Sequence, residues 1–162
     1  FHHLIKQCIV KGHSVNLIKL LSKNFMSTAG SWCDEDGNCL LHHECMKTRM
    51  YISTDIIIFL VTLTPENCNL YNNDGFSPKD LLSNVAMCKD ENGLIMLHHV
   101  ARSKLVTTKV VEFVVDAYPS GIFTPDNNGM LPFHHALLNF WIWDFDVVYT
   151  LLQLNPDAVA EK

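Results

Sequence analysis

The stretch Asp126-Asn127-Asn128-Gly129-Met130-Leu131-Pro132-Phe133-His134-His135 contains two features that recur along the chain. A polar turn ends in glycine, and a pair of histidines begins five residues after that glycine. The same arrangement occurs at 34–43 and 90–99, and a fourth turn, at 72–75, has Asp80 in the place of the first histidine. Asp-Gly and Asn-Gly pairs favour positive φ, so the sequence predicts four tight turns.

An apolar run that ends in proline follows three of these turns. The runs lie at 55–65, 109–119 and 146–156, and residues 55–75 align with 109–129 without a gap. Their apolar residues recur at helical spacing, which predicts helices buried on one side, and proline stops each helix. Self-similarity at a fixed period is typical of a solenoid, here built from turn, short helix, loop and second helix.

These repeats resemble the ankyrin family. The family phrase Gly, any residue, Thr, Pro, Leu, His is similar to the segments at 37–42, 75–80, 93–98 and 129–134, and its second phrase, Gly-His before an apolar run, is similar to 12–21. The resemblance covers the whole chain and implies an all-α fold, an ankyrin-type helical solenoid of stacked helix-turn-helix repeats joined by β-hairpin-like turns. Repeats of about 36 to 40 residues are longer than the family's 33.

We expect a single ankyrin-repeat array over residues 1–162. Its repeats lie at about 1–33, 34–71, 72–89, 90–125 and 126–162, of which the first is partial. The repeat at 72–89 is truncated, because only 18 residues separate Gly75 from Gly93, and it has room for one helix near 79–85. No turn precedes the pair at 2–3 and another would be due after Lys162, so the sequence is expected to be an excerpt of a longer chain.

The resemblance assigns repeat-forming roles to the turn glycines and to the first histidine of each pair. These positions are Gly37, Gly75, Gly93, Gly129, His42, His98 and His134. The second histidines, His3, His43, His99 and His135, fall on the first helix, which lines the partner-binding side in this family. Two interpretations stay open for them: imidazoles that bind an acidic partner below about pH 6.5, or exposed and half-packed side chains.

An aromatic segment, Phe140, Trp141, Trp143 and Phe145, lies between the two helices of the last repeat. Aromatic side chains dominate the energetics of protein interfaces. The segment is therefore a candidate for partner binding, or for packing onto a further repeat. Both interpretations predict that it is covered.

A zinc-binding or enzymatic domain centred on Cys39, His42 and Cys45 is the alternative to a binding module. Together with Cys33 these residues are the candidates for metal ligands, because zinc takes Cys and His, but their spacing is not that of the usual paired-Cys sites. The sequence has no phosphate-binding loop and no nucleophile elbow. It predicts no catalytic residue, no cofactor and no enzyme.

Composition limits the remaining classes of function. The 162 residues are 48% apolar and 18% charged, with a net charge of −5, which allows a core and argues against a nucleic-acid partner. The longest apolar run, 56–61, is too short to span a membrane. Six cysteines in a chain with an ample core indicate reduced thiols in an intracellular compartment. The sequence thus predicts a non-catalytic protein-protein interaction module: a scaffold, an adaptor or a peripheral subunit of a larger assembly.

Overall fold

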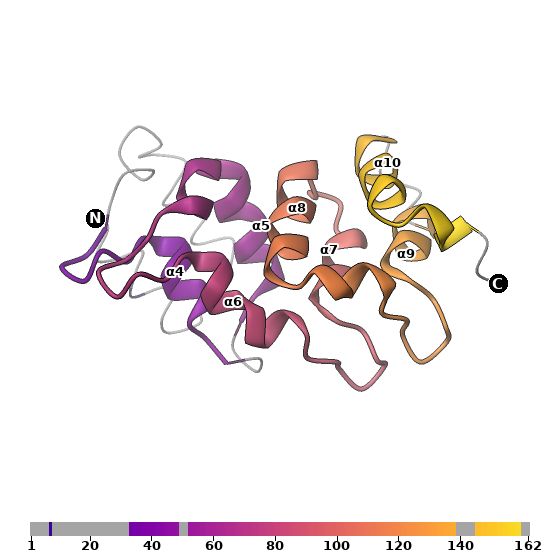
Figure 1. Cartoon of the computed structure of the whole chain (residues 1–162), viewed down its shortest axis with the longest axis horizontal. Coiled ribbons are helices and arrows are strands. Elements are labelled where there is room, and N and C mark those ends of the chain that lie inside the picture. Colours follow the sequence, from indigo (N-terminus) through magenta and orange to yellow (C-terminus); the bar gives the residue numbers. More distant parts are fainter. Residues whose placement is uncertain (1–6, 8–32, 49–51, 139–144, 160–162) are drawn as a thin grey trace. The chain divides into compact units, whose positions relative to one another are not determined.

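The computed structural model describes Gln7 and residues 33–48, 52–138 and 145–159, and Figure 1 shows their helices. The chain divides into two compact units, residues 1–82 (unit 1) and 83–162 (unit 2). All regular secondary structure in the described ranges is helical, with no strand among them, so the all-α class is confirmed. None of the described helices has the length and apolar character needed to cross a membrane.

Unit 1 holds α4 (Leu40–Cys45), α5 (Thr54–Leu63), the 3₁₀-helix η1 (Pro65–Asn69) and the first part of α6 (Pro78–Ala86). Helices α4 and α5 pack on each other, and their apolar side chains form the core of the unit. The hydroxyl of Ser53 caps α5 by accepting a hydrogen bond from the amide of Ile56, at 3.4 Å. The helix ends before Pro65, as the apolar run at 55–65 predicts.

Unit 2 begins within α6 and continues with two turn–helix–helix repeats. These contain α7 (Met96–Ala101), α8 (Thr108–Ala117), η2 (Pro119–Phe123), α9 (Pro132–Leu138), α10 (Phe145–Leu154) and η3 (Pro156–Val159). Helix α9 packs on α7 and α10 on α8, so the two repeats are stacked. Val110 and Val114 of α8 and Val147 and Leu151 of α10 are all buried, which places an apolar stripe of each helix in the core.

The predicted helices are confirmed wherever the structure describes them. The proline-terminated runs are α5, α8 and α10, and the single helix expected near 79–85 is α6. Each terminating proline opens a short 3₁₀-helix, because its missing N–H is not needed at the first helical position. The partial repeat predicted at 1–33, with the pair at 2–3 and the phrase at 12–21, lies outside the described residues except for Gln7 and Cys33.

The four predicted turns are confirmed by their backbone. Gly37, Gly75, Gly93 and Gly129 have φ between 77° and 81°, the left-handed region that glycine favours. In each turn the glycine amide donates to the carbonyl of the first turn residue, at 3.0 to 3.1 Å. The turns were expected to be β-hairpin-like, but no residue beside them in the described ranges is part of a strand.

Candidate partner-binding site

Two first histidines of these pairs, His42 and His98, tie the start of their helix to the following turn. His98 is the third residue of α7, and its Nδ1 accepts a hydrogen bond from the amide of Ile95, at 3.1 Å. Its Nε2 lies 3.1 Å from the carbonyl oxygen of Met130, which can only accept, so Nε2 carries the proton. His42 makes the same pair of bonds within unit 1, with Nε2 3.1 Å from the carbonyl of Phe76.

These bonds require a neutral imidazole. Burial, together with the nearby imidazole of His135, lowers the pKa of His98 from 6.5 to about 4. Burial also lowers the pKa of His42. Both side chains are therefore uncharged at neutral pH and serve as bridges between consecutive repeats, with no ring nitrogen left for a metal ion or a substrate.

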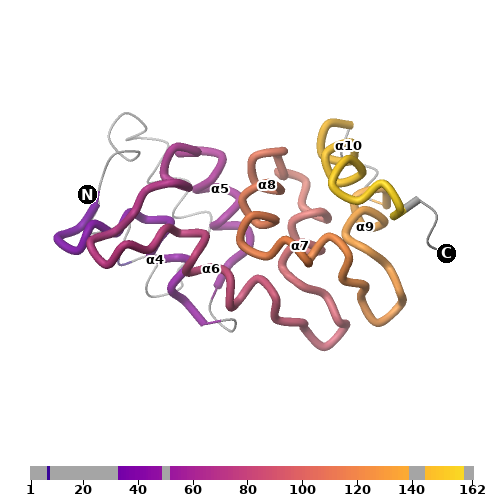
Figure 2. The backbone as a smooth tube through the Cα atoms, in the orientation of Figure 1, coloured from indigo at the N-terminus to yellow at the C-terminus, as the bar shows by residue number. Residues whose placement is uncertain are grey.

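Asparagines join the turns to one another. In unit 2 the amide N–H of Asn127 donates to the carbonyl of Asn92 and its side-chain Nδ2 donates to the carbonyl of Glu91, both at 3.0 Å. In unit 1 Asn73 makes the same two bonds, at 2.9 Å, to the carbonyls of the second and third residues of turn 34–37. Figure 2 shows the loops at 90–93 and 126–129 side by side. Each unit thus presents two stacked turns.

Each described second histidine pairs with the first aspartate of its own turn. The Nε2 atoms of His43, His99 and His135 lie 2.9, 3.1 and 2.9 Å from carboxylate oxygens of Asp34, Asp90 and Asp126. His43 and His135 are half-buried and His99 is exposed. His3 lies outside the described residues. An acidic partner would therefore meet imidazoles that already contact a carboxylate.

Two of these aspartates, Asp90 and Asp126, are held in their charged form. Partial burial raises the pKa of Asp126, but the hydrogen bonds it accepts from the amide of Met130, from His135 and from the amide of Asn128 together outweigh this, and its pKa lies below the ordinary value. The pKa of Asp90 is lowered in the same way. The Asp–His pairs are consequently part of the turn structure. Sequence analysis missed them, although aspartate and second histidine are always nine residues apart.

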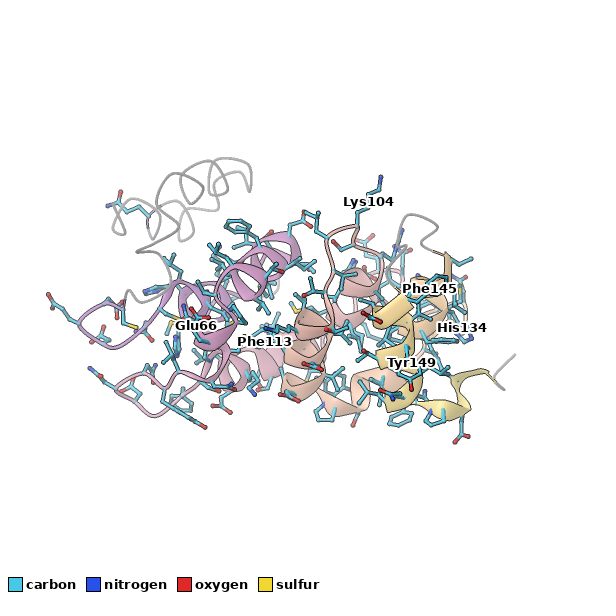
Figure 3. All side chains as sticks on the ribbon, turned by 90° about the horizontal axis from the view of Figure 1, so that it is seen from above. Glu66, Lys104, Phe113, His134, Phe145 and Tyr149 are labelled. Carbon is cyan, nitrogen blue, oxygen red and sulfur yellow. The ribbon has the colours of Figure 1, made fainter. Side chains whose placement is uncertain are left out.

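One aromatic candidate from the last repeat lies within the described residues. Phe145, the first residue of α10, is 79% exposed, and Tyr149, one helical turn later, is exposed as well (Figure 3). Phe140, Trp141 and Trp143 lie outside the described residues. Sequence analysis ended the aromatic segment at Phe145 and so missed Tyr149.

A second aromatic pair, also missed, flanks the turn at 72–75 in unit 1. Tyr71 is 70% exposed and Phe76 is 50% exposed, and they stand on either side of this turn. The two stacked turns of this unit also carry exposed carboxylates, those of Glu35, Asp36 and Asp74. The signal was available in the sequence, because no other turn of the chain has aromatic residues on both sides.

The described cysteines and histidines of unit 1 do not form a metal site or an activated thiol. No group of three or more His, Cys, Asp or Glu side chains in the described ranges is placed to hold a metal ion. Cys39 Sγ lies 3.0 Å from His42 Nδ1, but burial raises the pKa of both Cys39 and Cys45, whereas a reactive cysteine needs a lowered one. Ile95 occupies the position of Cys39 in the next full repeat, so the histidine keeps its place without a thiol.

No protein-family model matches the chain, and no curated protein matches it in sequence. The proposal below is therefore based on the residues and their geometry.

Proposed function

We propose that the chain is a non-catalytic protein-protein interaction module of the ankyrin type. The resemblance in sequence supports this proposal, and so does the bonding that repeats from one turn to the next: a histidine bridge, an asparagine pair and an Asp–His pair. Such bonding holds the two turns of each unit together, and side chains on a rigid frame suit recognition of another protein. The step from fold to function is an analogy with the family.

The observation that carries the proposal is the surface of the stacked turns in unit 1. Tyr71 and Phe76 expose large aromatic side chains that are not part of the core, and the same two turns carry the exposed carboxylates of Glu35, Asp36 and Asp74. Aromatic side chains provide the anchors of most interfaces, and a charged rim guides the approach of the partner. The surface suits a protein segment with apolar and basic side chains.

The module would act as a scaffold, an adaptor or a peripheral subunit of a larger assembly. The aromatic pair Phe145 and Tyr149 in unit 2 offers a second exposed contact for such an assembly. The five described cysteines are free thiols, which suits a reducing, intracellular compartment.

Site-specific photo-cross-linking tests the proposal. A photoreactive amino acid at position 71 should capture a protein partner in cells, and the yield should fall strongly when Phe76→Ser is added. Only the main-chain carbonyl of Phe76 bonds to His42, so this substitution leaves the bridge in place. The control is the same photoreactive group at exposed Phe123 in unit 2. Equal capture from both positions, or capture at 71 that Phe76→Ser does not change, would contradict the proposal.

A further inference from the structure

We propose that the C-terminal face of unit 2 docks a further turn–helix–helix repeat whose turn carries asparagine at its second position. The face consists of turn 126–129, His134, and the sides of α9 and α10 that do not contact α7 and α8. The inference is independent of the proposed function, because it would hold even if the stacked turns bound no partner.

The helices of the last repeat expose apolar positions that the preceding repeat buries. Ala101 of α7 is fully buried, whereas Leu137, its counterpart 36 residues later on α9, is 52% exposed. Val111 of α8 is also fully buried, whereas its counterpart Val148 on α10 is half-exposed, and Val115 and Leu152 differ in the same way. The positions on α9 and α10 are apolar like their buried counterparts on α7 and α8, but they are exposed to solvent. This face therefore has the composition of a buried helix–helix interface.

His134 presents an unused hydrogen-bond donor on the same face. Its Nδ1 accepts from the amide of Leu131, at 2.9 Å, which repeats the helix-start bond of His98 and leaves the proton on Nε2. The Nε2 of His98 donates to the carbonyl of Met130 in the next turn, but Nε2 of His134 has no partner among the described residues. Figure 3 shows this side chain on α9. A carbonyl just after the glycine of a following turn would complete the bridge.

The space beside Gly129 in turn 126–129 is open, whereas the space beside Gly93 in turn 90–93 is filled by Asn127. A Cβ atom added to Gly93 would lie 2.4 Å from Oδ1 and 2.7 Å from the amide nitrogen of Asn127, whereas one added to Gly129 would have no atom within 4 Å. The carbonyls of Asn92 and Glu91 accept the two bonds from Asn127. The corresponding carbonyls of turn 126–129, those of Asn128 and Asn127, receive no hydrogen bond from the described part of the chain.

These features specify the occupant. A hollow at glycine, two carbonyl acceptors, a histidine donor and an apolar helix pair are what repeat 90–125 presents to repeat 126–162, so the fitting partner is another such repeat. A second copy of this chain fits less well. The turns with asparagine at the second position, 72–75 and 126–129, already bond to a turn of their own unit, and the other two turns have Glu35 and Glu91, which carry no amide donor.

An in-register extension tests the inference. A second copy of residues 126–162 placed directly after Lys162 starts its turn seven residues after Pro156, the spacing that separates Pro119 from Asp126. If the face docks this repeat, Gly129→Ala should become far more damaging in the extended chain. We expect it to raise the unfolding equilibrium constant of unit 2, followed by hydrogen exchange of α9 and α10, about 30-fold more than in the 162-residue chain.

Gly93→Ala is the matched control and should have the same effect in both chains. An extension with alanine in place of its copied Asn127 should reduce the excess, and the Nε2 resonance of ¹⁵N-labelled His134 should shift only in the extended chain. An equal effect of Gly129→Ala in the two chains, with an unshifted His134 resonance, would overturn the inference. So would self-association of the 162-residue chain that Gly129→Ala abolishes, because a second copy would then be the occupant.

Discussion

Replacing Gly93 with alanine measures how strongly the stacked turns stabilise unit 2, and Gly129 provides a matched control. Both glycines have φ of +77°, so alanine costs roughly 1–2 kcal/mol of backbone strain at either position. At Gly93 the new methyl group would also meet the side chain and backbone of Asn127, at 2.4 to 2.9 Å. At Gly129 it would enter open space. The difference between the two variants therefore isolates the contact between turns.

The size of the difference follows from what must move. Contacts of 2.4 and 2.7 Å are too short for real atoms, and one of them involves the backbone, so a side-chain rotation of Asn127 alone does not relieve them. Turn 126–129 has to shift, which breaks the two bonds of Asn127 to the carbonyls of Asn92 and Glu91. Each bond contributes about 1 kcal/mol. Gly93→Ala should therefore cost about 3–4 kcal/mol and Gly129→Ala about 1–2 kcal/mol.

Urea denaturation followed by circular dichroism gives the overall stability, and hydrogen exchange of α7 and α8 assigns the loss to unit 2. The excess cost of Gly93→Ala should shrink when Asn127→Ala is also present, because part of the clash and one bond are then already gone. Equal costs for Gly93→Ala and Gly129→Ala would refute the reasoning. It would show that the turns do not rest on one another.

Three other predictions concern titration and buried polar groups. Lowering the pH from 7 to 4 should destabilise unit 2 by up to about 3 kcal/mol, because His98 has a pKa of about 4 in the folded state and about 6.5 in the unfolded chain. The urea midpoint of unfolding should fall as the pH is lowered, and it should fall less in His98→Gln. Glu44→Ala should cost about 3–5 kcal/mol in a urea titration and Glu44→Gln less, because the buried carboxylate accepts a 2.7 Å bond from the ammonium group of Lys47. A double-mutant cycle on Asp126 and His135 should give a coupling of about 1 kcal/mol, larger than for the more exposed pair Asp90 and His99. A coupling of zero would contradict the pairing of Asp126 with His135.

The helices were predictable from the sequence because their signals are local. The runs at 55–65, 109–119 and 146–156 combine an apolar stripe at helical spacing with a proline stop, and each became a helix within a few residues of the expected bounds. The turns were predictable for the same reason, since Asp-Gly and Asn-Gly pairs specify a backbone conformation without reference to the rest of the fold.

The site was less predictable because its bonds join residues from different turns and helices. Nothing local distinguishes Asn127, which bonds to the preceding turn, from Asn128, which does not. The aspartate and second histidine do leave a trace in the sequence. In the one turn where asparagine replaces the aspartate, at Asn72, the residue nine positions later is Leu81 and not histidine. Both members of the pair are lost together, as expected of side chains that bond to each other.

The residue types in the segment 39–45 suggested a metal site, but in the structure His42 has a structural role. Cys39, His42 and Cys45 have the right atoms for zinc, but bonds to the protein occupy both nitrogens of His42. The number of candidate ligands in a segment says nothing about which of their lone pairs and protons are still available. That depends on partners such as Phe76, 34 residues away.

The truncated repeat shows how an aspartate can take the place of the first histidine. Asp80 replaces the first histidine, and its carboxylate accepts from the amide of Ser77 at 2.8 Å and from its hydroxyl at 2.6 Å, so the start of α6 is capped as a histidine would cap it. These hydrogen bonds lower the pKa of Asp80, which is therefore ionised at neutral pH. An ionised carboxylate has no proton to donate to a carbonyl of the following turn, which is the bond that His42 and His98 provide.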